Sequence, residues 1–503
     1  MTSTLLFSAK QLMAGYRNTP VLEDINWQWQ AGQQWAVLGA NGAGKSALAD
    51  VLSNTLKPLR GERHWLHGLD PKQDIQQLSF ERHRQLIEHD KRFDNSNENE
   101  DAFDTGTTVG RYIISGLAQG TTPNANQTEH NTSRFEKIVE DCGIKSIIDQ
   151  GVRYISTGES RKTLLARALY HNPKILIIDN PYEGLDQGSQ ASFRALLDKL
   201  LLSNIAILLL LQDPAELPSN ISHVLQLESG HIIAQGEKNN IIDMLHIAQP
   251  KSVTAASRAL PEALPRSYQV PLEQPLFKLC HVNVSYHDKP VLNDVNWQFD
   301  HGQHCHISGP NGAGKSTLLS LLCGDNHKAY GQDITLFGRK RGSGETVWDI
   351  KEKFGVVNTQ LQLTHINRMR VAEVIASGLY DTVGLYHNCQ GKARDIALQW
   401  LHTIGLESLA KTPFGELSFG QQRLALLARA MVKSPLVLIL DEPCLGLDRS
   451  HRQQILSLVD QIAASGSSHI LYVSHVSEEL PHCINQKLQL VTHPSGGYSS
   501  KVS

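Results

Sequence analysis

Two glycine-rich segments have the residue types and the spacing that suit binding of a polyphosphate. The first runs Gly39-Ala-Asn-Gly-Ala-Gly-Lys-Ser46 and the second runs Gly309-Pro-Asn-Gly-Ala-Gly-Lys-Ser316, so both satisfy G-x-x-x-x-G-K-[ST]. Glycines let a backbone curl so that its N–H groups surround phosphate oxygens, the lysine reaches the β- and γ-phosphates, and the serine hydroxyl binds Mg²⁺. Each segment therefore predicts a P-loop that binds Mg-ATP. The predicted nucleotide contacts are Gly39, Asn41, Gly42, Gly44, Lys45, Ser46 and Ala47 in the first loop, and Gly309, Asn311, Gly312, Gly314, Lys315, Ser316 and Thr317 in the second.

Each predicted P-loop has a matching aspartate at the end of an apolar run. The runs are Lys174-Ile-Leu-Ile-Ile-Asp179 and Leu436-Val-Leu-Ile-Leu-Asp441, and each is followed by Gly-Leu-Asp. An aspartate at the end of a buried strand positions the magnesium shell in this class of site. The sequence therefore predicts that Mg²⁺ is held by Ser46 with Asp179 and by Ser316 with Asp441.

The elements that position these residues occur twice in the chain. Tyr16-Arg-Asn-Thr-Pro-Val-Leu-Glu-Asp-Ile-Asn-Trp27 realigns with Tyr286-His-Asp-Lys-Pro-Val-Leu-Asn-Asp-Val-Asn-Trp297, at an offset of 286 − 16 = 270. In the first copy the alternation of Ile25, Trp27 and Trp29 predicts a strand, and a second apolar strand over 35–38 leads into the P-loop. The order of strand, P-loop and helix predicts an α/β fold of the P-loop NTPase type, in two tandem copies.

The regular pattern lapses between the two copies. Residues 249–273 are punctuated by prolines, which indicates a linker between a domain over 1–248 and a domain over 274–503. Two polar stretches, 90–108 and 120–133, predict solvated surface loops inserted in the first copy.

Composition excludes several classes of protein. The chain has 503 residues, 40% apolar and 19% charged, with a formal net charge of −3, which describes an ordinary globular protein. Its seven cysteines are scattered, which indicates neither a disulfide framework nor a zinc site and favours a reducing cytoplasm. The longest aliphatic run, 205–211, is too short to cross a bilayer, so we expect no membrane span in this chain.

These motifs resemble those of the ABC ATPase family over nearly the whole chain. Leu417-Ser-Phe-Gly-Gln-Gln-Arg423 is similar to the signature loop of that family, and Ile155-Ser-Thr-Gly-Glu159 matches it loosely. The resemblance implies two nucleotide-binding domains, each with a helical subdomain, which pack head to tail with ATP between the P-loop of one and the signature loop of the other. It further implies that Ser156 and Gly158, and in the second copy Ser418, Gly420 and Gln421, complete the phosphate cage, and that Tyr16 and Tyr286 stack on adenine.

The same resemblance indicates that the two sites are unequal. Glu442 stands where the family has the residue that polarises the attacking water, and His475 stands where it has a γ-phosphate sensor. The first copy has Asn180 and Gln212 at these positions, and neither can act as a base. A general base contributes about 10²–10⁴-fold, so we expect one hydrolytic site and one site that retains ATP; unselected drift at Asn180 and Gln212 is the alternative.

A glutamine that the family uses for Mg²⁺ and for contact with a partner is off pattern. Gln360 lies one residue late in the second copy, and Phe80 stands at the corresponding place in the first. Gln360 is nevertheless the predicted metal ligand of this loop.

The resemblance extends to tandem ATP-binding proteins associated with bacterial molybdate-transport loci. It rests on the segment 336–350 and on the signature over 155–159, which departs from the usual family pattern. It implies a peripheral ATPase at the inner face of the cytoplasmic membrane, with permease subunits as partners. The alternative is a soluble ATP switch that acts on a cytosolic assembly such as the ribosome. A nucleic-acid partner is not expected, because the linker is short and broken by prolines.

Overall fold

The computed structural model describes residues 4–16, 19–66, 68–79, 106–115, 125–183, 185–248, 258–266, 268, 270–286, 289–358, 368–382, 391–474 and 480–503. The chain forms two compact units, Met1–Ser252 and Val253–Ser503. Each unit contains one P-loop and the strand and helix that flank it.

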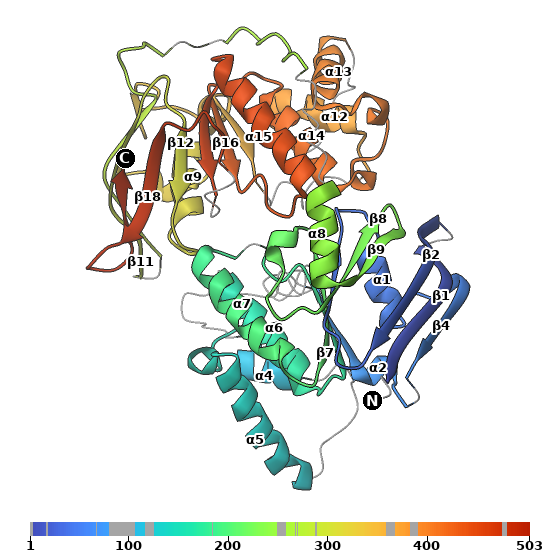
Figure 1. Cartoon of the computed structure of the whole chain (residues 1–503). Helices are drawn as coiled ribbons and strands as arrows, with labels where there is room; N and C mark the ends of the chain where they lie inside the picture. The colour runs from blue at the N-terminus through green and yellow to red at the C-terminus, as the bar shows by residue number, and fades with distance from the viewer. Residues whose placement is uncertain are drawn as a thin grey trace. The chain divides into compact units, whose positions relative to one another are not determined.

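The first unit is built on two sheets (Figure 1). Its strands are β1 (Leu5–Tyr16), β2 (Thr19–Gln30), β3 (Trp35–Leu38), β4 (Pro58–Trp65), β5 (Ile75–Ser79), β6 (Ile175–Asp179), β7 (Ala206–Leu211), β8 (His223–Glu228) and β9 (His231–Glu237). Its helices are α1 (Lys45–Leu52), α2 (Pro71–Asp74), α4 (Val109–Ile114), α5 (Ala125–Asp141), α6 (Thr157–Tyr170), α7 (Gln187–Leu201) and α8 (Lys238–Ala248). One sheet is antiparallel, in the order β2-β1-β4, and the other has the order β5-β6-β7-β3-β8-β9 and is parallel except for β9.

The larger sheet of the first unit is the central layer, because both of its faces are buried. In β3, Trp35 and Val37 join the hydrophobic cluster shared with α1 and the antiparallel sheet, while Ala36 and Leu38 join the cluster shared with α4 to α7. Successive side chains of a strand point to opposite faces, so an unbroken apolar run suits a strand covered on both sides. Figure 1 shows the antiparallel sheet and the helices α4 to α7 on opposite sides of this layer.

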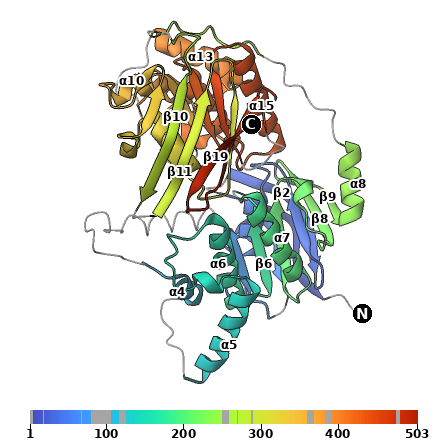
Figure 2. The same ribbon diagram turned by 90° about the vertical axis from the view of Figure 1, so that its left-hand side faces the viewer.

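The second unit repeats this plan in one continuous sheet. Its strands are β10 (Phe277–Tyr286), β11 (Lys289–Phe299), β12 (Cys305–Ser308), β13 (Asp333–Leu336), β14 (Arg339–Lys340), β15 (Phe354–Val357), β16 (Val437–Asp441), β17 (His469–Val473), β18 (Gln486–Thr492) and β19 (Tyr498–Val502). Its helices are α9 (Lys315–Cys323), α10 (Val347–Lys351), α12 (Val371–Ser377), α13 (Lys392–Ile404), α14 (Phe419–Met431) and α15 (Arg449–Ala464). The strand order is β14-β13-β10-β11-β19-β18-β12-β17-β16-β15, and Figure 2 shows β10, β11 and β19 side by side.

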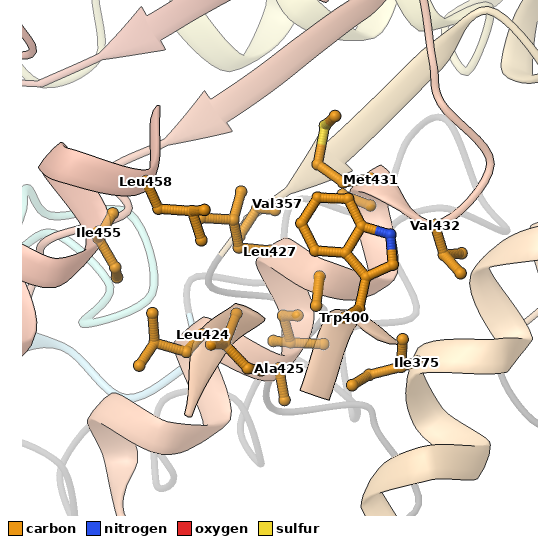
Figure 3. Packing of buried hydrophobic residues seen from close by; sticks show 14 of the residues in the cluster. Val357, Ile375, Trp400, Leu424, Ala425, Leu427, Met431, Val432, Ile455 and Leu458 are labelled. Carbon is orange, nitrogen blue, oxygen red and sulfur yellow. The ribbon is translucent and has the colours of Figure 1, made fainter. Parts of the chain in front are cut away.

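A helical subdomain covers one face of the second unit's sheet. Trp400 of α13 packs among side chains of α12 and α14 and lies in the same cluster as Val357 at the end of β15 (Figure 3). Leu424 and Leu427 of α14 and Leu458 of α15 continue this core. The α/β fold with a helical subdomain, expected from the motifs, is confirmed.

The predicted strands are confirmed, and one predicted loop is wrong in part. β2 contains the alternating Ile25, Trp27 and Trp29, all buried, and β3 has the predicted bounds. The stretch 120–133 was expected to be a solvated loop, but from Ala125 onward it is helical and belongs to α5. Polar residues also occur along amphipathic helices, and α5 places Ile138 and Val139 in the buried core.

The part of the predicted linker that the structure describes lies against the second unit. Arg258 Nη1 donates to the carbonyl of His402 at 2.5 Å and pairs with Glu407 Oε1 at 2.5 Å. Further along, Leu264 N donates to Ser434 Oγ at 2.8 Å. Residues 258–266 therefore run from the helical subdomain to the start of β16 and are held at both ends.

Candidate nucleotide sites

Each P-loop is a turn between a parallel strand and a helix. The loop joins β3 to α1 in the first unit and β12 to α9 in the second. The residue before each helix, Gly44 or Gly314, has a left-handed backbone with φ of 105° and 86°. Only glycine adopts this conformation without strain, so the motif's last glycine directs the helix N-terminus, with its free N–H groups, toward the loop.

The two P-loop lysines hold the same position in their units. Lys45 Nζ donates to Gly39 O at 2.6 Å and to Ala40 O at 3.0 Å. Lys315 Nζ donates to Gly309 O at 2.8 Å and to Pro310 O at 3.0 Å. Both lysines are more than 90% buried, at 6% and 8% exposed. Each ammonium group is thus fixed inside its loop by backbone carbonyls, in reach of a phosphate that enters the loop.

The remaining predicted contacts of the P-loops fall where the motif requires. Asn41, Gly42, Asn311 and Gly312 lie in the loops, and Lys45, Ser46, Ala47, Lys315, Ser316 and Thr317 lie in the first turns of α1 and α9.

Hydroxyl and carboxylate oxygens meet at the predicted magnesium position. Ser46 Oγ lies 3.3 Å from Asp179 Oδ2, at the carboxyl end of β6. In the second unit Asp441 ends β16 and Ser316 lies in the first turn of α9, so the same two residue types come from the same two elements. Oxygen ligands of this kind suit Mg²⁺, which keeps several waters and substrate phosphates in its shell. When bound, Mg²⁺ would neutralise charge on the β- and γ-phosphates.

Asn180 and Glu442 hold equivalent backbone positions just after these aspartates. Both residues have a left-handed backbone, with φ of 46° and 49°. The N–H of Asn180 donates to Leu210 O at 3.0 Å, and the N–H of Glu442 donates to Val473 O at 3.0 Å. The two units therefore offer the same place for a water-polarising residue, and the difference between them is confined to the side chain.

The predicted signature residues begin helices α6 and α14. Ser156 and Ser418 are the N-cap residues, and each side chain accepts from the N–H three residues later, Glu159 N and Gln421 N, both at 3.3 Å. In return, Glu159 Oε2 accepts from the N–H of Ser156 at 2.8 Å, and Gln421 Oε1 accepts from the N–H of Ser418 at 2.9 Å. This capping box satisfies the N-cap and N3 N–H groups of each helix, and in the first unit it places the Glu159 carboxylate at the helix N-terminus.

A close approach explains the glycine in each signature loop. A Cβ at Gly158 would lie 2.8 Å from Ser189 Oγ, and a Cβ at Gly420 would lie 2.3 Å from the His451 ring. Ser189 and His451 belong to helices α7 and α15, which the aspartates of the Gly-Leu-Asp patterns cap. The signature loop of each unit thus packs against the element that follows its own Asn180 or Glu442 loop.

Tyr16 and Tyr286 end strands β1 and β10 and remain partly exposed, at 46% and 37%. Their hydroxyl groups have different partners. Tyr16 Oη donates to Asp50 Oδ2 at 2.5 Å, whereas Tyr286 Oη accepts from Asn326 Nδ2 at 2.8 Å.

Two buried arginines join the signature helices to the Asn180 and Glu442 loops. Arg161 Nη1 donates to Asn180 O and Pro181 O, both at 2.8 Å, and its Nη2 donates to Glu183 O. Arg423 Nη2 lies 3.4 Å from Glu442 O. Burial lowers the pKa of Arg161 to about 10, so it stays charged at neutral pH. Motif reasoning missed both residues, although an arginine five positions after each signature serine was a visible signal.

Two predicted site residues lie outside the described part of the chain. These are His475, the expected γ-phosphate sensor, and Gln360, the expected metal ligand. Both stay predictions.

With this geometry in place, the family comparison is decisive. Residues 22–183 and 292–445 match the family described as ABC transporter. The chain belongs to the ABC transporter family. As a tandem ABC ATP-binding protein it is an ATPase. Within the described ranges, none of its helices is long and apolar enough to cross a membrane.

Relatives with the tandem organisation span the whole chain. The ABC transporter ATP-binding protein ModF of Escherichia coli (strain K12) is 38% identical over 97% of this chain and 98% of its own length. An uncharacterized ABC transporter ATP-binding protein, C323.04 of Schizosaccharomyces pombe, is 26% identical over 94% of this chain and 95% of its own.

Two solved structures share the fold over nearly the whole chain. Archaeal ribosome recycling factor aABCE1, in complex with ribosomal stalk protein aP1, has a TM-score of 0.55 at 17% identity, over 97% of this chain and 89% of its own. A ribosome-bound archaeal Pelota and ABCE1 structure has a TM-score of 0.61 at 14% identity, over 98% and 78%. Identities this low show the fold alone.

Proposed function

We propose that the chain is the ATPase of a transport system, with one hydrolytic site and one site that retains ATP. The observation that supports this is the pair Asn180 and Glu442, which share a backbone position and differ in the group that could take a proton from water. The hydrolytic site would use Lys315, Ser316 and Asp441 with Glu442, and His475 as γ-phosphate sensor.

The retaining site would use Lys45, Ser46 and Asp179. From the family resemblance, domains over 1–248 and 274–503 would close on ATP, with the signature loops at Ser156 and Ser418 completing the cages.

Single-turnover and steady-state ATPase assays on Glu442→Gln test the proposal. Loss of the general base should lower turnover by about 10²–10⁴-fold while ATP stays bound. Lys45→Ala is the matched variant in the first unit, and it should remove one bound ATP with a smaller effect on turnover. Steady ATP turnover by Glu442→Gln would contradict the proposal that only the second site hydrolyses ATP.

A membrane permease is the proposed partner, and the resemblance to proteins of molybdate-transport loci makes molybdate the proposed cargo class. Cargo selection would belong to the permease. The Glu442→Gln chain, expressed at native level, should then sediment with the membrane fraction and co-purify with one permease.

A second candidate is an ATP-driven switch that acts on a large assembly such as the ribosome. The off-pattern position of Gln360, and Phe80 in place of the first glutamine, favour it, because that loop is where the family meets its transport partner. Co-sedimentation of Glu442→Gln with ribosomes, and no permease in the membrane fraction, would support this candidate and exclude transport.

A further inference from the structure

The two tyrosines proposed to stack on adenine are tethered by unrelated residues. Asp50 belongs to α1, the helix that follows the P-loop, and it is only 7% exposed. Asn326 follows α9 and is only 8% exposed. At the repeat offset of 270, the partner of Asp50 is Ser320 (320 − 50 = 270) and the partner of Asn326 is Leu56 (326 − 56 = 270). In the second unit the Asn326 amide also donates to Ser320 Oγ at 3.1 Å, so the residue at the Asp50 position reaches the tyrosine directly in the first unit and through Asn326 in the second.

The tethers have opposite hydrogen-bond polarity. In the first unit the Tyr16 hydroxyl is the donor, and the 2.5 Å distance to Asp50 Oδ2 is that of a charge-assisted O–H···O⁻ bond. In the second unit the Tyr286 hydroxyl is the acceptor of the Asn326 amide at 2.8 Å. A phenol that donates to a carboxylate gains electron density in its ring, and a phenol that accepts from an amide loses some.

Tyr286 also has a cationic neighbour. Lys328 Nζ lies 5.2 Å from the centroid of the Tyr286 ring, within the range of a cation–π contact. The π-electrons of Tyr286 therefore already interact with an ammonium group.

From these contacts we infer that Asp50 and Asn326 are positioning residues that set different adenine affinities at the two sites, with the tighter hold in the first. Asp50 fixes the ring plane of Tyr16 before nucleotide arrives and makes its face more attractive to a purine, which lowers the ordering cost of stacking. Tyr286 has a hydrogen bond only between neutral groups, to the Asn326 amide, and its ring also contacts the Lys328 ammonium group. A weaker hold on adenine suits a site that must release ADP after each turnover. The inference rests on the proposed stacking role of Tyr16 and Tyr286.

The test measures the first site in the full chain, with Lys315→Ala to empty the second. Asp50→Ser places there the residue that the second copy has at the same position, and Tyr16→Phe keeps the ring but removes the hydroxyl. Each change should weaken Mg-ATP binding by about fivefold, the size expected from one hydrogen bond, and the double variant should be no weaker than either single variant. Binding of inorganic tripolyphosphate, which has no base, should be unchanged.

Asn326→Leu, measured with Lys45→Ala, is the matched variant in the second unit. It places there the residue of the first copy and should weaken Mg-ATP binding at the second site without affecting the first.

The other outcomes are distinguishable. If Asp50→Ser weakens ATP and tripolyphosphate equally, Asp50 acts on the P-loop helix and the inference is wrong. If Tyr16→Ala weakens ATP binding while Tyr16→Phe and Asp50→Ser do not, the ring stacks but its tether is irrelevant, which also overturns the inference. If Tyr16→Ala leaves ATP affinity unchanged, the proposed stacking itself fails.

Discussion

Asn180 and Glu442 share one backbone geometry and differ in the side chain, which is an amide in the first unit and a carboxylate in the second. Each follows the strand-ending aspartate, each has φ near +50°, and each donates its N–H to the neighbouring strand at 3.0 Å. A non-glycine residue in this conformation is strained, and both units keep it. The loop is therefore built to present one side chain, and only the second unit presents a carboxylate.

Asn180→Glu should confer hydrolysis on the first site. In a Glu442→Gln background the added carboxylate would occupy the place that Glu442 has in the second unit, so part of the lost 10²–10⁴-fold should return. The measurement is single-turnover hydrolysis of prebound ATP. Asn180→Gln is the control, because it has the same length as glutamate but cannot accept a proton. Equal rates for the two variants would mean that the missing carboxylate is not what limits this site.

Arg161→Met should destabilise the first unit. The arginine satisfies the carbonyls of Asn180, Pro181 and Glu183 in a buried setting, and its loss leaves them without that donor. Unmet buried carbonyls cost about 1–3 kcal/mol each before relaxation, so we expect a loss of about 2–4 kcal/mol. Thermal unfolding monitored by hydrogen exchange would show whether the loss of stability is confined to the first unit. Lys162→Met, whose ammonium bonds only to the exposed Ser192 hydroxyl, should have little effect.

Arg266→Ala should loosen the start of β16. Arg266 Nε donates to Ser434 O at 2.9 Å and Nη2 donates to Pro435 O at 2.9 Å, with a further bond to Ser467 O. Hydrogen exchange should rise in peptides covering 434–437 and 467–470. Arg258→Ala is the matched control, because its ion pair with Glu407 is about 40% exposed on both sides and contributes less. Equal protection in both variants would contradict a structural role for the docked segment.

Acid should destabilise the second unit through a partly buried group of histidines, His301, His304 and His469. Burial lowers the pKa of His469 to about 4; its hydrogen bond to Leu436 O opposes this, and His301, His304 and Arg266 add to it. Burial also lowers the pKa of His304. The unfolded histidine takes up its proton near pH 6.5, so stability should fall as pH decreases from about 6.5 to 4 and then level off.

Urea unfolding at several pH values would measure this dependence. His469→Gln should flatten it over the same window, while the exposed His482→Gln should leave it unchanged. A wild-type stability that does not change between pH 6.5 and 4 would disprove the assignment.

The sequence by itself determined the P-loops, the strand-ending aspartates, the duplication and the contrast between Asn180 and Glu442. These are local patterns, because the residues that carry the chemistry lie within a few consecutive positions. The spacing of the glycines and of the lysine in each motif is enough to predict the backbone conformation of the loop. The strands that lead into the P-loops were predictable for the same reason, since a buried strand must be apolar.

Only the tertiary structure decided which side chains meet across the fold. Tyr16 and Asp50 are 34 residues apart in the sequence. In the second copy the equivalent tyrosine, Tyr286, bonds to Asn326, which lies at a different position of the repeat, so aligning the two copies does not identify these partners. Arg161 finds its carbonyl partners only because α6 packs beside the loop after β6. Such contacts depend on how separate elements pack. The proline-containing segment 258–266 shows no regular pattern in the sequence, and only the structure shows that Arg258, Leu264 and Arg266 bind it to the second unit.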